Sequence, residues 1–186
     1  MSGNPTSKRR YLILLLVSVG VIVLDQLTKL AVIDRFKLGE SIPVLDNLFS
    51  LTYIRNTGAA FGILATADPA FRVPFFVIVP LVALLAIGYI FRKIPESDIK
   101  LSTALSLVIG GAIGNLIDRV RLGFVIDFLD FHWKFQYHFP AFNVADSAIC
   151  VGVGLLMLDL LVAPDKNDKG EVNHGAGGSR AGQAVP

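Results

Sequence analysis

The chain has 186 residues, of which 53% are hydrophobic and 17% are charged, and its mean hydropathy is +0.62. This composition excludes an ordinary soluble domain and predicts a membrane protein. The net charge is only +2, and no basic run is interleaved with aromatic residues, so we expect no nucleic-acid partner.

Four apolar stretches are long enough, or nearly so, to cross about 30 Å of hydrocarbon as helices. They cover residues 11–33, 73–91, 101–117 and 144–163. We predict an all-α membrane protein with a single domain over residues 1–163. Its outer segments, 34–72 and 118–143, are expected to form a small extracytoplasmic β-sheet lying on the membrane surface. Residues 164–186 are rich in glycine and charge and predict a disordered cytoplasmic tail.

Basic residues cluster at two places that indicate the orientation of the chain. They are Lys8, Arg9 and Arg10 before the first helix, and Arg92, Lys93 and Lys100 between the second and third. Such clusters mark the cytoplasmic side, so both termini are predicted to be cytoplasmic and the longer segments to face outward. A basic start before an apolar run also occurs in cleaved secretory signals. No small-x-small site follows here, which favours a retained helix.

The two outer segments carry strand signals. Residues 49–54 contain several β-branched and aromatic residues and predict a short strand ending at the turn formers 56–58. In the second segment every other residue is aromatic: Phe131, Trp133, Phe135, Tyr137 and Phe139. If the segment is extended, these rings share one face. That face either lies at the lipid headgroups as an interfacial belt or packs on the small sheet.

Polar side chains collect at the outer ends of three predicted helices. They are Asp25 and Lys29 in the first, Gly111, Asn115, Asp118 and Arg119 in the third, and Asn143 and Asp146 at the start of the fourth. Spacings of three and four residues place the members of each set on one helix face. These faces should contact protein rather than lipid, so the three polar ends are expected to converge. Asn143 is a candidate cap of the fourth helix.

Two aspartates stand in apolar surroundings, Asp127 within an apolar run and Asp146 at the head of the fourth helix. A carboxylate at the edge of hydrocarbon costs free energy, about 2.5 to 3.5 kcal/mol at a helix centre, and usually marks a functional site. The structural alternative is an ion pair with Arg119, Arg121 or Lys29, because ion pairs at helix ends are common. Asp146 has no cation within two turns of sequence, which favours pairing of the two carboxyls with each other.

Two carboxyls in one site predict aspartyl protease chemistry. Repulsion between like charges raises the pKa of one of them, so the pair shares a proton. The ionised member takes a proton from a water that attacks a peptide carbonyl, while the protonated member polarises that carbonyl and then protonates the leaving amine. Water and two carboxyls suffice for this step, so we expect no metal or other cofactor.

Other chemistries fit the residues less well. Ser147 has no histidine or lysine placed to activate it as a nucleophile. Asp130, His132 and His138 are candidate metal ligands, but the two histidines are six residues apart in a predicted strand and match no zinc spacing. Cys150, the single cysteine of the chain, is expected to pack within the fourth helix.

At these polar residues the sequence resembles the lipoprotein signal peptidases of bacteria, also called type II signal peptidases. Five motifs carry the resemblance, in the order of the family: DQLTK (25–29), NTGAAFG (56–62), GGAIGNLIDR (110–119), VIDF (125–128) and FNVADS (142–147). The resemblance covers about residues 11–163, and the last three motifs together are highly specific.

The resemblance implies an intramembrane aspartyl endopeptidase with Asp127 and Asp146 as catalytic residues. Such an enzyme removes the signal peptide from prolipoproteins just before a cysteine that carries diacylglycerol. The implied setting is the bacterial inner membrane with the active site at the outer leaflet, and the implied partners are lipidated prolipoproteins and membrane lipid, with the protein acting as a monomer. The implied substrate contacts or supporting residues are Asn56, Asn115, Arg119, Asp25, Gly111 and Asn143.

Two other functions are alternatives. A proton-coupled transporter would relay protons through Asp25, Asp118, Asp127 and Asp146, but a relay needs polar groups at several depths of the membrane. Here nearly all of them lie at the outer helix ends, which favours chemistry at the membrane surface. The second alternative, a non-catalytic binder of prolipoproteins, is disfavoured because both aspartates are intact.

Overall fold

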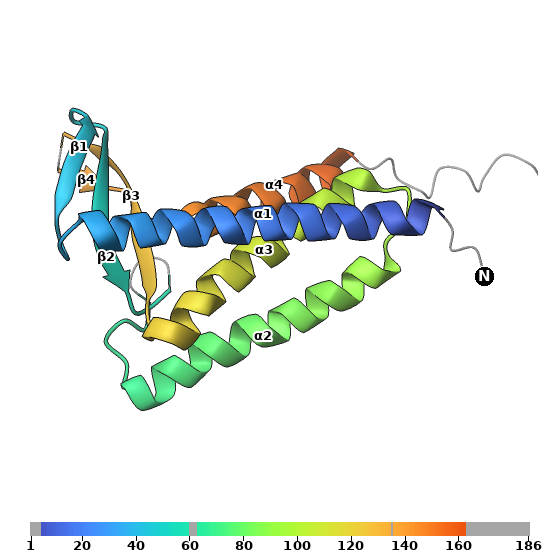
Figure 1. Cartoon of the computed structure of the whole chain (residues 1–186), viewed down its shortest axis with the longest axis horizontal. Helices are drawn as coiled ribbons and strands as arrows, with labels where there is room; N and C mark the ends of the chain where they lie inside the picture. The colour runs from blue at the N-terminus through green and yellow to red at the C-terminus, as the bar shows by residue number, and fades with distance from the viewer. Residues whose placement is uncertain (1–4, 60–62, 135, 163–186) are drawn as a thin grey trace, which may run out of the picture.

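The computed structural model describes residues 5–59, 63–134 and 136–162. In this part of the chain, four long helices carry an antiparallel sheet at one end (Figure 1). The helices are α1 (Pro5–Arg35), α2 (Pro69–Lys93), α3 (Ile99–Leu122) and α4 (Val144–Val162). Each is long and apolar enough to cross a membrane, so the predicted fold class is confirmed. The predicted tail, residues 164–186, lies outside the described residues.

The third helix continues past its predicted end at residue 117. In the structure α3 continues to Leu122. It ends there because Gly123 adopts the left-handed conformation, with φ 78°, and donates its N–H to the carbonyl of Arg119. Asp118 and Arg119 therefore belong to the helix, and the segment that connects α3 to α4 begins at residue 123 rather than at 118.

The sheet contains β1 (Ser41–Leu45), β2 (Phe49–Asn56), β3 (Val125–Trp133) and β4 (Tyr137–His138), hydrogen-bonded in that order. The strand predicted at residues 49–54 is part of β2. In the β2–β3 register Ile54 pairs with Asp127, and Asn56 pairs with Val125. Asn56 and Asp127 are therefore diagonal neighbours on one face of the sheet, within reach of each other's side chains.

The alternating aromatic residues form a hairpin rather than a single extended strand. The chain reverses after Trp133, where Lys134 has φ 51°, and Trp133 pairs with Tyr137 across the turn. The reversal keeps the rings on one side of the sheet, as the alternation predicted. Four rings of this face are between 44% and 73% exposed: Phe131, Trp133, Tyr137 and Phe139. Phe131 also stacks on Phe142 at 5.9 Å, whereas Phe135 lies outside the described residues.

An apolar cluster fixes the sheet to the helices. Val32 of α1 packs with Tyr53 of β2 and with Ile126 and Phe128 of β3, and all four side chains are buried. Side chains of a strand alternate between its two faces. Because Ile126 and Phe128 face this cluster, Asp127 between them points to the opposite face of β3.

Small residues let α3 approach α1 and α4 closely. A Cβ atom at Gly110 would lie 3.0 Å from the Cα of Ser18 in α1, and one at Gly152 would lie 2.7 Å from the carbonyl oxygen of Ala104 in α3. Close packing of this kind holds helices together in lipid, where burial of apolar surface gives little driving force. In the described part of the chain, α2 packs mainly on α3 and diverges from the other helices in Figure 1.

Replacing Gly152 with leucine is expected to lower the free energy of unfolding by about 1–3 kcal/mol, because α4 must move away from Ala104 and Val108. Gly154→Leu is the matched control, since a Cβ atom at Gly154 meets no other atom within 4 Å. Thermal unfolding of both variants in detergent measures the difference. An equal melting temperature for the two leucine variants would contradict this packing.

Candidate active site

A cavity of about 800 Å³ opens where the sheet meets the adjoining ends of α3 and α4. Its polar lining consists mainly of Asp127, Asp146, Asn56, Asn115 and Arg119. Its apolar lining includes Ile54, Val125, Phe139, Phe142 and Ile149. A cavity with a few polar groups among apolar side chains fits a ligand that is itself largely apolar.

Asp127 enters this cavity from β3, and only 2% of its surface is exposed. Its Oδ2 atom accepts a hydrogen bond from Asn56 Nδ2 at 2.9 Å, and its Oδ1 atom accepts one from Asn143 Nδ2 at 2.8 Å. The first bond follows from the β2–β3 register, which makes Asn56 a diagonal neighbour. Both oxygens are thus fixed by amide donors.

Asp146 enters from the first turn of α4. Its Oδ1 atom accepts from Asn115 Nδ2 at 2.7 Å, and its Oδ2 atom accepts from the backbone N–H of Asn143 at 3.2 Å. The Asn143 side chain in turn accepts from the backbone N–H of Asp146 at 2.9 Å. Asn143 therefore caps the helix, as predicted, in a reciprocal arrangement that fixes the start of α4.

Asn143 also connects the two carboxyls. Its amide nitrogen donates to Asp127, while its backbone binds one oxygen of Asp146. One fully buried residue therefore fixes both aspartates on the wall of a single cavity. This arrangement brings together two residues that are 19 positions apart in the sequence, 127 and 146.

The environment of Asp127 favours its protonated form. Its pKa is raised from 3.8 to about 7, chiefly by burial and next by the nearby charge of Asp146. The hydrogen bonds from Asn56 and Asn143 act in the opposite direction and are outweighed. Among the described residues, neither Asp127 nor Asp146 forms a salt bridge with a lysine, arginine or histidine. The carboxyls are therefore not neutralised as structural ion pairs.

A buried ion cluster lies directly behind the two aspartates. Lys29 forms salt bridges of 2.9 Å with Asp25 of its own helix and with Asp118 of α3. Asp25 also accepts from the backbone N–H of Ala145 at 2.9 Å, and Asp118 accepts from that of Ile126 at 3.2 Å. The structural ion pairs that were the alternative role for Asp127 and Asp146 are thus formed by Asp25 and Asp118 instead. The ion pairs and these two hydrogen bonds together join α1, α3, α4 and β3.

Arg119 lies at the edge of the cavity. Its Nη2 atom donates to the carbonyl of Gly58 at 3.0 Å, and its guanidinium lies 4.3 Å from the ring centre of Phe76 in α2. Gly58 is required where it stands, because a Cβ atom there would lie 2.5 Å from the carbonyl oxygen of Ile63. Arg119 therefore fixes the chain that follows β2 at the mouth of the cavity.

The six residues expected to contact or support a substrate fall into two groups. Asn56, Asn115 and Arg119 line the cavity. Asp25, Gly111 and Asn143 are buried and are not among its lining residues, so the structure favours a supporting position for them. Gly111 packs so closely on Ala145 that it leaves no room for a side chain between α3 and α4.

Some lining residues were missed by sequence reasoning. Cys150, expected to pack in the bundle, is exposed and lines the cavity, because it lies one turn after Asp146 on the same face of α4. Phe139 and Phe142 also line it, and Phe139 was recognised only as a member of the aromatic alternation. The spacing of four residues from Asp146 was the available signal for Cys150. His138 pairs with Asp130 at 3.0 Å, away from the cavity.

Comparison with known proteins gives a consistent result. A family model described as "Signal peptidase (SPase) II" matches residues 17–162. The chain is 55% identical over 149 residues to the lipoprotein signal peptidase of Syntrophotalea carbinolica, covering 80% of this chain and 91% of that protein. It is also 55% identical over 154 residues to the lipoprotein signal peptidase of Geobacter sulfurreducens, covering 83% and 94%.

Solved structures agree with the sequence relatives. One bacterial membrane enzyme superposes with a TM-score of 0.73 and 38% identity, covering 87% of this chain and 94% of that one. A second superposes with a TM-score of 0.72 and 36% identity, covering 80% and 92%.

Proposed function

The chain belongs to the signal peptidase II family, and we propose that it cleaves diacylglyceryl-modified prolipoproteins with Asp127 and Asp146 as its catalytic pair. The family indicated by the five sequence motifs is confirmed, and with it the prediction of a membrane protease that removes signal peptides from prolipoproteins. The role of each residue within that reaction is the proposal.

One observation carries the assignment of the pair. Asn143 binds both Asp127 and Asp146, and each carboxyl has its two oxygens fixed by amide donors on the wall of one cavity. Fixed carboxyls in one site reduce the reorganisation needed in the reaction. The raised pKa of Asp127 supports its proposed role as the protonated member of the pair.

The proposed reaction needs one water and one proton on the pair. Ionised Asp146 removes a proton from the water, whose oxygen attacks the carbonyl carbon of the scissile peptide bond. Protonated Asp127 donates a hydrogen bond to the carbonyl oxygen, on which negative charge develops. The carbon–nitrogen bond then breaks as the leaving nitrogen takes its proton from Asp127, while the pair keeps the proton that Asp146 removed from water. The products are the new carboxyl group of the signal peptide and the free amine of the lipidated cysteine.

The lining of the cavity supports a lipidated substrate. Ile54, Phe142 and Ile149 offer apolar surface for acyl chains beside the two carboxyls. Asn56, Asn115 and Arg119 are proposed to hold the peptide backbone near the cut. Membrane lipid is a further proposed partner, because acyl chains must reach the cavity from the bilayer. Action as a monomer is part of this proposal.

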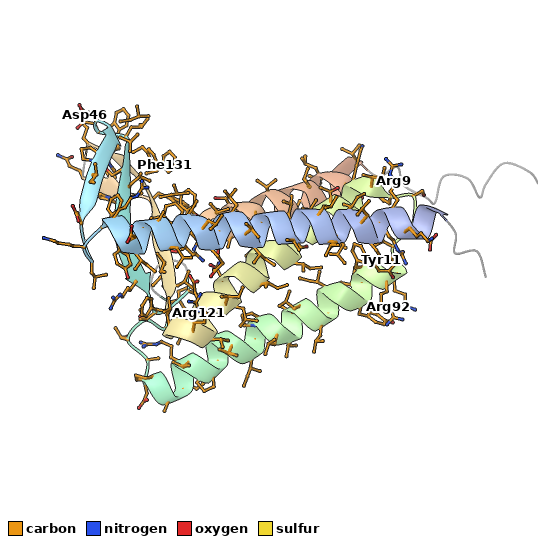
Figure 2. The ribbon with its side chains drawn as sticks, in the orientation of Figure 1. Arg9, Tyr11, Asp46, Arg92, Arg121 and Phe131 are labelled. Atoms are coloured by element: carbon orange, nitrogen blue, oxygen red, sulfur yellow. The ribbon has the colours of Figure 1, made fainter. Side chains whose placement is uncertain are left out.

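The proposed location is the bacterial inner membrane, with both termini in the cytoplasm and the site at the outer leaflet. Figure 2 labels Arg9 and Arg92 together at the end of the helices away from the sheet. These residues belong to the basic clusters that mark a cytoplasmic side. Asp25, Asp118, Asp127 and Asp146 are connected through Lys29, Asn115 and Asn143 near the opposite end. This clustering at one depth argues against the transmembrane relay that a proton-coupled transporter requires.

The test is cleavage by the purified protein in detergent of a precursor peptide prepared with and without diacylglycerol on its cysteine. Cleavage just before the cysteine is expected for the lipidated peptide, with kcat/KM at least about 100-fold higher than for the unlipidated one, because the apolar lining binds the acyl chains. Mass spectrometry of the products gives the site of the cut. Equal rates for the two peptides would contradict the proposed substrate.

A further inference from the structure

Lys29 makes a contact that its charge alone does not require. The side chain is 1% exposed, and its ammonium is already balanced by Asp25 and Asp118 at 2.9 Å each. The third donor of the ammonium points to a neutral group, the Oδ1 atom of Asn115, also at 2.9 Å. Lys29 therefore contacts Asn115, a residue that lines the cavity, through the oxygen of its side-chain amide.

This contact determines how the amide of Asn115 is oriented. Its oxygen faces two donors, Lys29 Nζ and Asn143 Nδ2, the latter at 3.2 Å. If the amide were turned by 180°, its NH₂ group would face both donors, and neither could accept a hydrogen bond. The NH₂ group of Asn115 must therefore point the other way, where it donates to Asp146 Oδ1 at 2.7 Å.

The orientation matters for the reaction because an ionised carboxylate only accepts hydrogen bonds. With Asn115 as placed, both oxygens of Asp146 face N–H donors. A flipped amide would present its oxygen to Asp146, which favours a protonated carboxyl there. We propose that Lys29 is a positioning residue that acts through Asn115 to keep Asp146 ionised and ready to accept a proton from water. This inference rests on the proposed catalytic pair.

The charged groups that face this part of the site come from four elements. They are Asp25 and Lys29 from α1, Asp118 and Arg119 from α3, Asp127 from β3 and Asp146 itself from α4. Removing Lys29 alone would leave Asp25 and Asp118 unpaired in the interior, which is expected to impair folding. The informative variant therefore removes one carboxylate together with the lysine.

The variant Lys29→Met/Asp118→Asn removes one positive and one negative charge, so the net charge of the cluster is unchanged. An asparagine at position 118 can still accept from the N–H of Ile126, and Asp25 retains its bonds from Gln26 and Ala145. Asp118→Asn alone is the matched control, because it preserves the bond from Lys29 to Asn115. A second double variant, Lys29→Gln/Asp118→Asn, keeps a polar group at position 29.

The experiment measures kcat and KM for the lipidated precursor peptide over a range of pH, together with thermal unfolding, for the full-length protein. For Lys29→Met/Asp118→Asn we expect kcat to fall roughly 10- to 100-fold with KM changed by less than about threefold, as for loss of a hydrogen bond to a charged group. The acid limb of its pH profile is expected to move to higher pH. The Asp118→Asn control should keep the native profile and a kcat within about threefold of native.

Three outcomes would overturn the inference. The first is a folded double variant with native kcat and native pH profile. The second is a loss of kcat with an unchanged pH profile, because a merely structural lysine would give that result. The third is failure of both double variants to fold while Asp118→Asn folds, which would make Lys29 a folding residue. Failure of the catalytic pair itself is distinguished by Asp127→Asn and Asp146→Asn, which would then retain activity.

Discussion

Replacing either Asp127 or Asp146 with asparagine is expected to lower kcat for a lipidated precursor by at least about 10³-fold, within the range that general acid–base groups contribute. Asparagine neither accepts the proton of water nor donates one to the leaving amine at neutral pH. The fold should be retained, because asparagine has nearly the same shape and each position loses at most one hydrogen bond to a neighbouring amide. Removal of a buried carboxyl also removes its desolvation cost.

The matched control is Asp130→Asn. Asp130 lies on β3 like Asp127 and is also buried, but it pairs with His138 and does not line the cavity. Its variant is expected to keep kcat within about threefold of native. Measurements under single-turnover conditions, with thermal unfolding of all three variants, separate chemistry from folding. Substantial cleavage by both Asp127→Asn and Asp146→Asn would refute the catalytic pair.

Activity is expected to fall as the pH rises above about 7, by roughly tenfold per unit, so that kcat/KM at pH 9 is about 100-fold below its maximum. The reason is the pKa of Asp127, raised to about 7 by burial and by the charge of Asp146. Asp127 must be protonated to act as the acid, and its protonated fraction declines above that pH.

The sign of this dependence distinguishes the two possible roles of Asp127. If Asp127 were the base and Asp146 the acid, activity would rise with pH up to about 7 instead of falling above it. The measurement is kcat/KM for the lipidated peptide from about pH 5 to about pH 9, at constant ionic strength. A rate that increases through pH 7 would contradict the assignment.

The raised pKa of Asp127 also makes the free energy of unfolding depend on pH. The folded-state pKa of Asp127 lies above its ordinary value of 3.8, so the folded protein binds more protons than the unfolded chain between about pH 4 and pH 7. The contribution of Asp127 to the free energy of unfolding therefore falls as the pH rises through this window. Burial of the Asp127 carboxyl in the site thus lowers the free energy of unfolding near neutral pH.

The sequence predicted the features that depend on local patterns. Four apolar runs gave the spanning helices, and Asp127 and Asp146 were conspicuous because carboxylates are rare in apolar surroundings. Spacings of three and four residues correctly placed Asn115 with Arg119 and Asn143 with Asp146 on shared helix faces. Asn143 acts as the cap of α4, as its residue type and position suggested.

Features that depend on long-range geometry were not predictable in the same way. The end of α3 is set by the backbone of Gly123, so the helix continues to Leu122, five residues beyond the predicted end at 117. The triple contact of Lys29 combines α1 with two positions of α3, and no spacing within one helix reveals it. The hairpin turn at Lys134 likewise divides the alternating aromatic segment, whose pattern predicted a single extended strand.

The most direct test of the account is a titration of the Asp127 carboxyl by ¹³C NMR, in the native protein and in Asp146→Asn. We expect a midpoint near 7 in the native protein and a lower midpoint in the variant, because burial remains while the neighbouring charge is removed. A midpoint near 3.8 in the native protein, or one that does not change when Asp146 loses its charge, would contradict the claim that these two residues act as a pair.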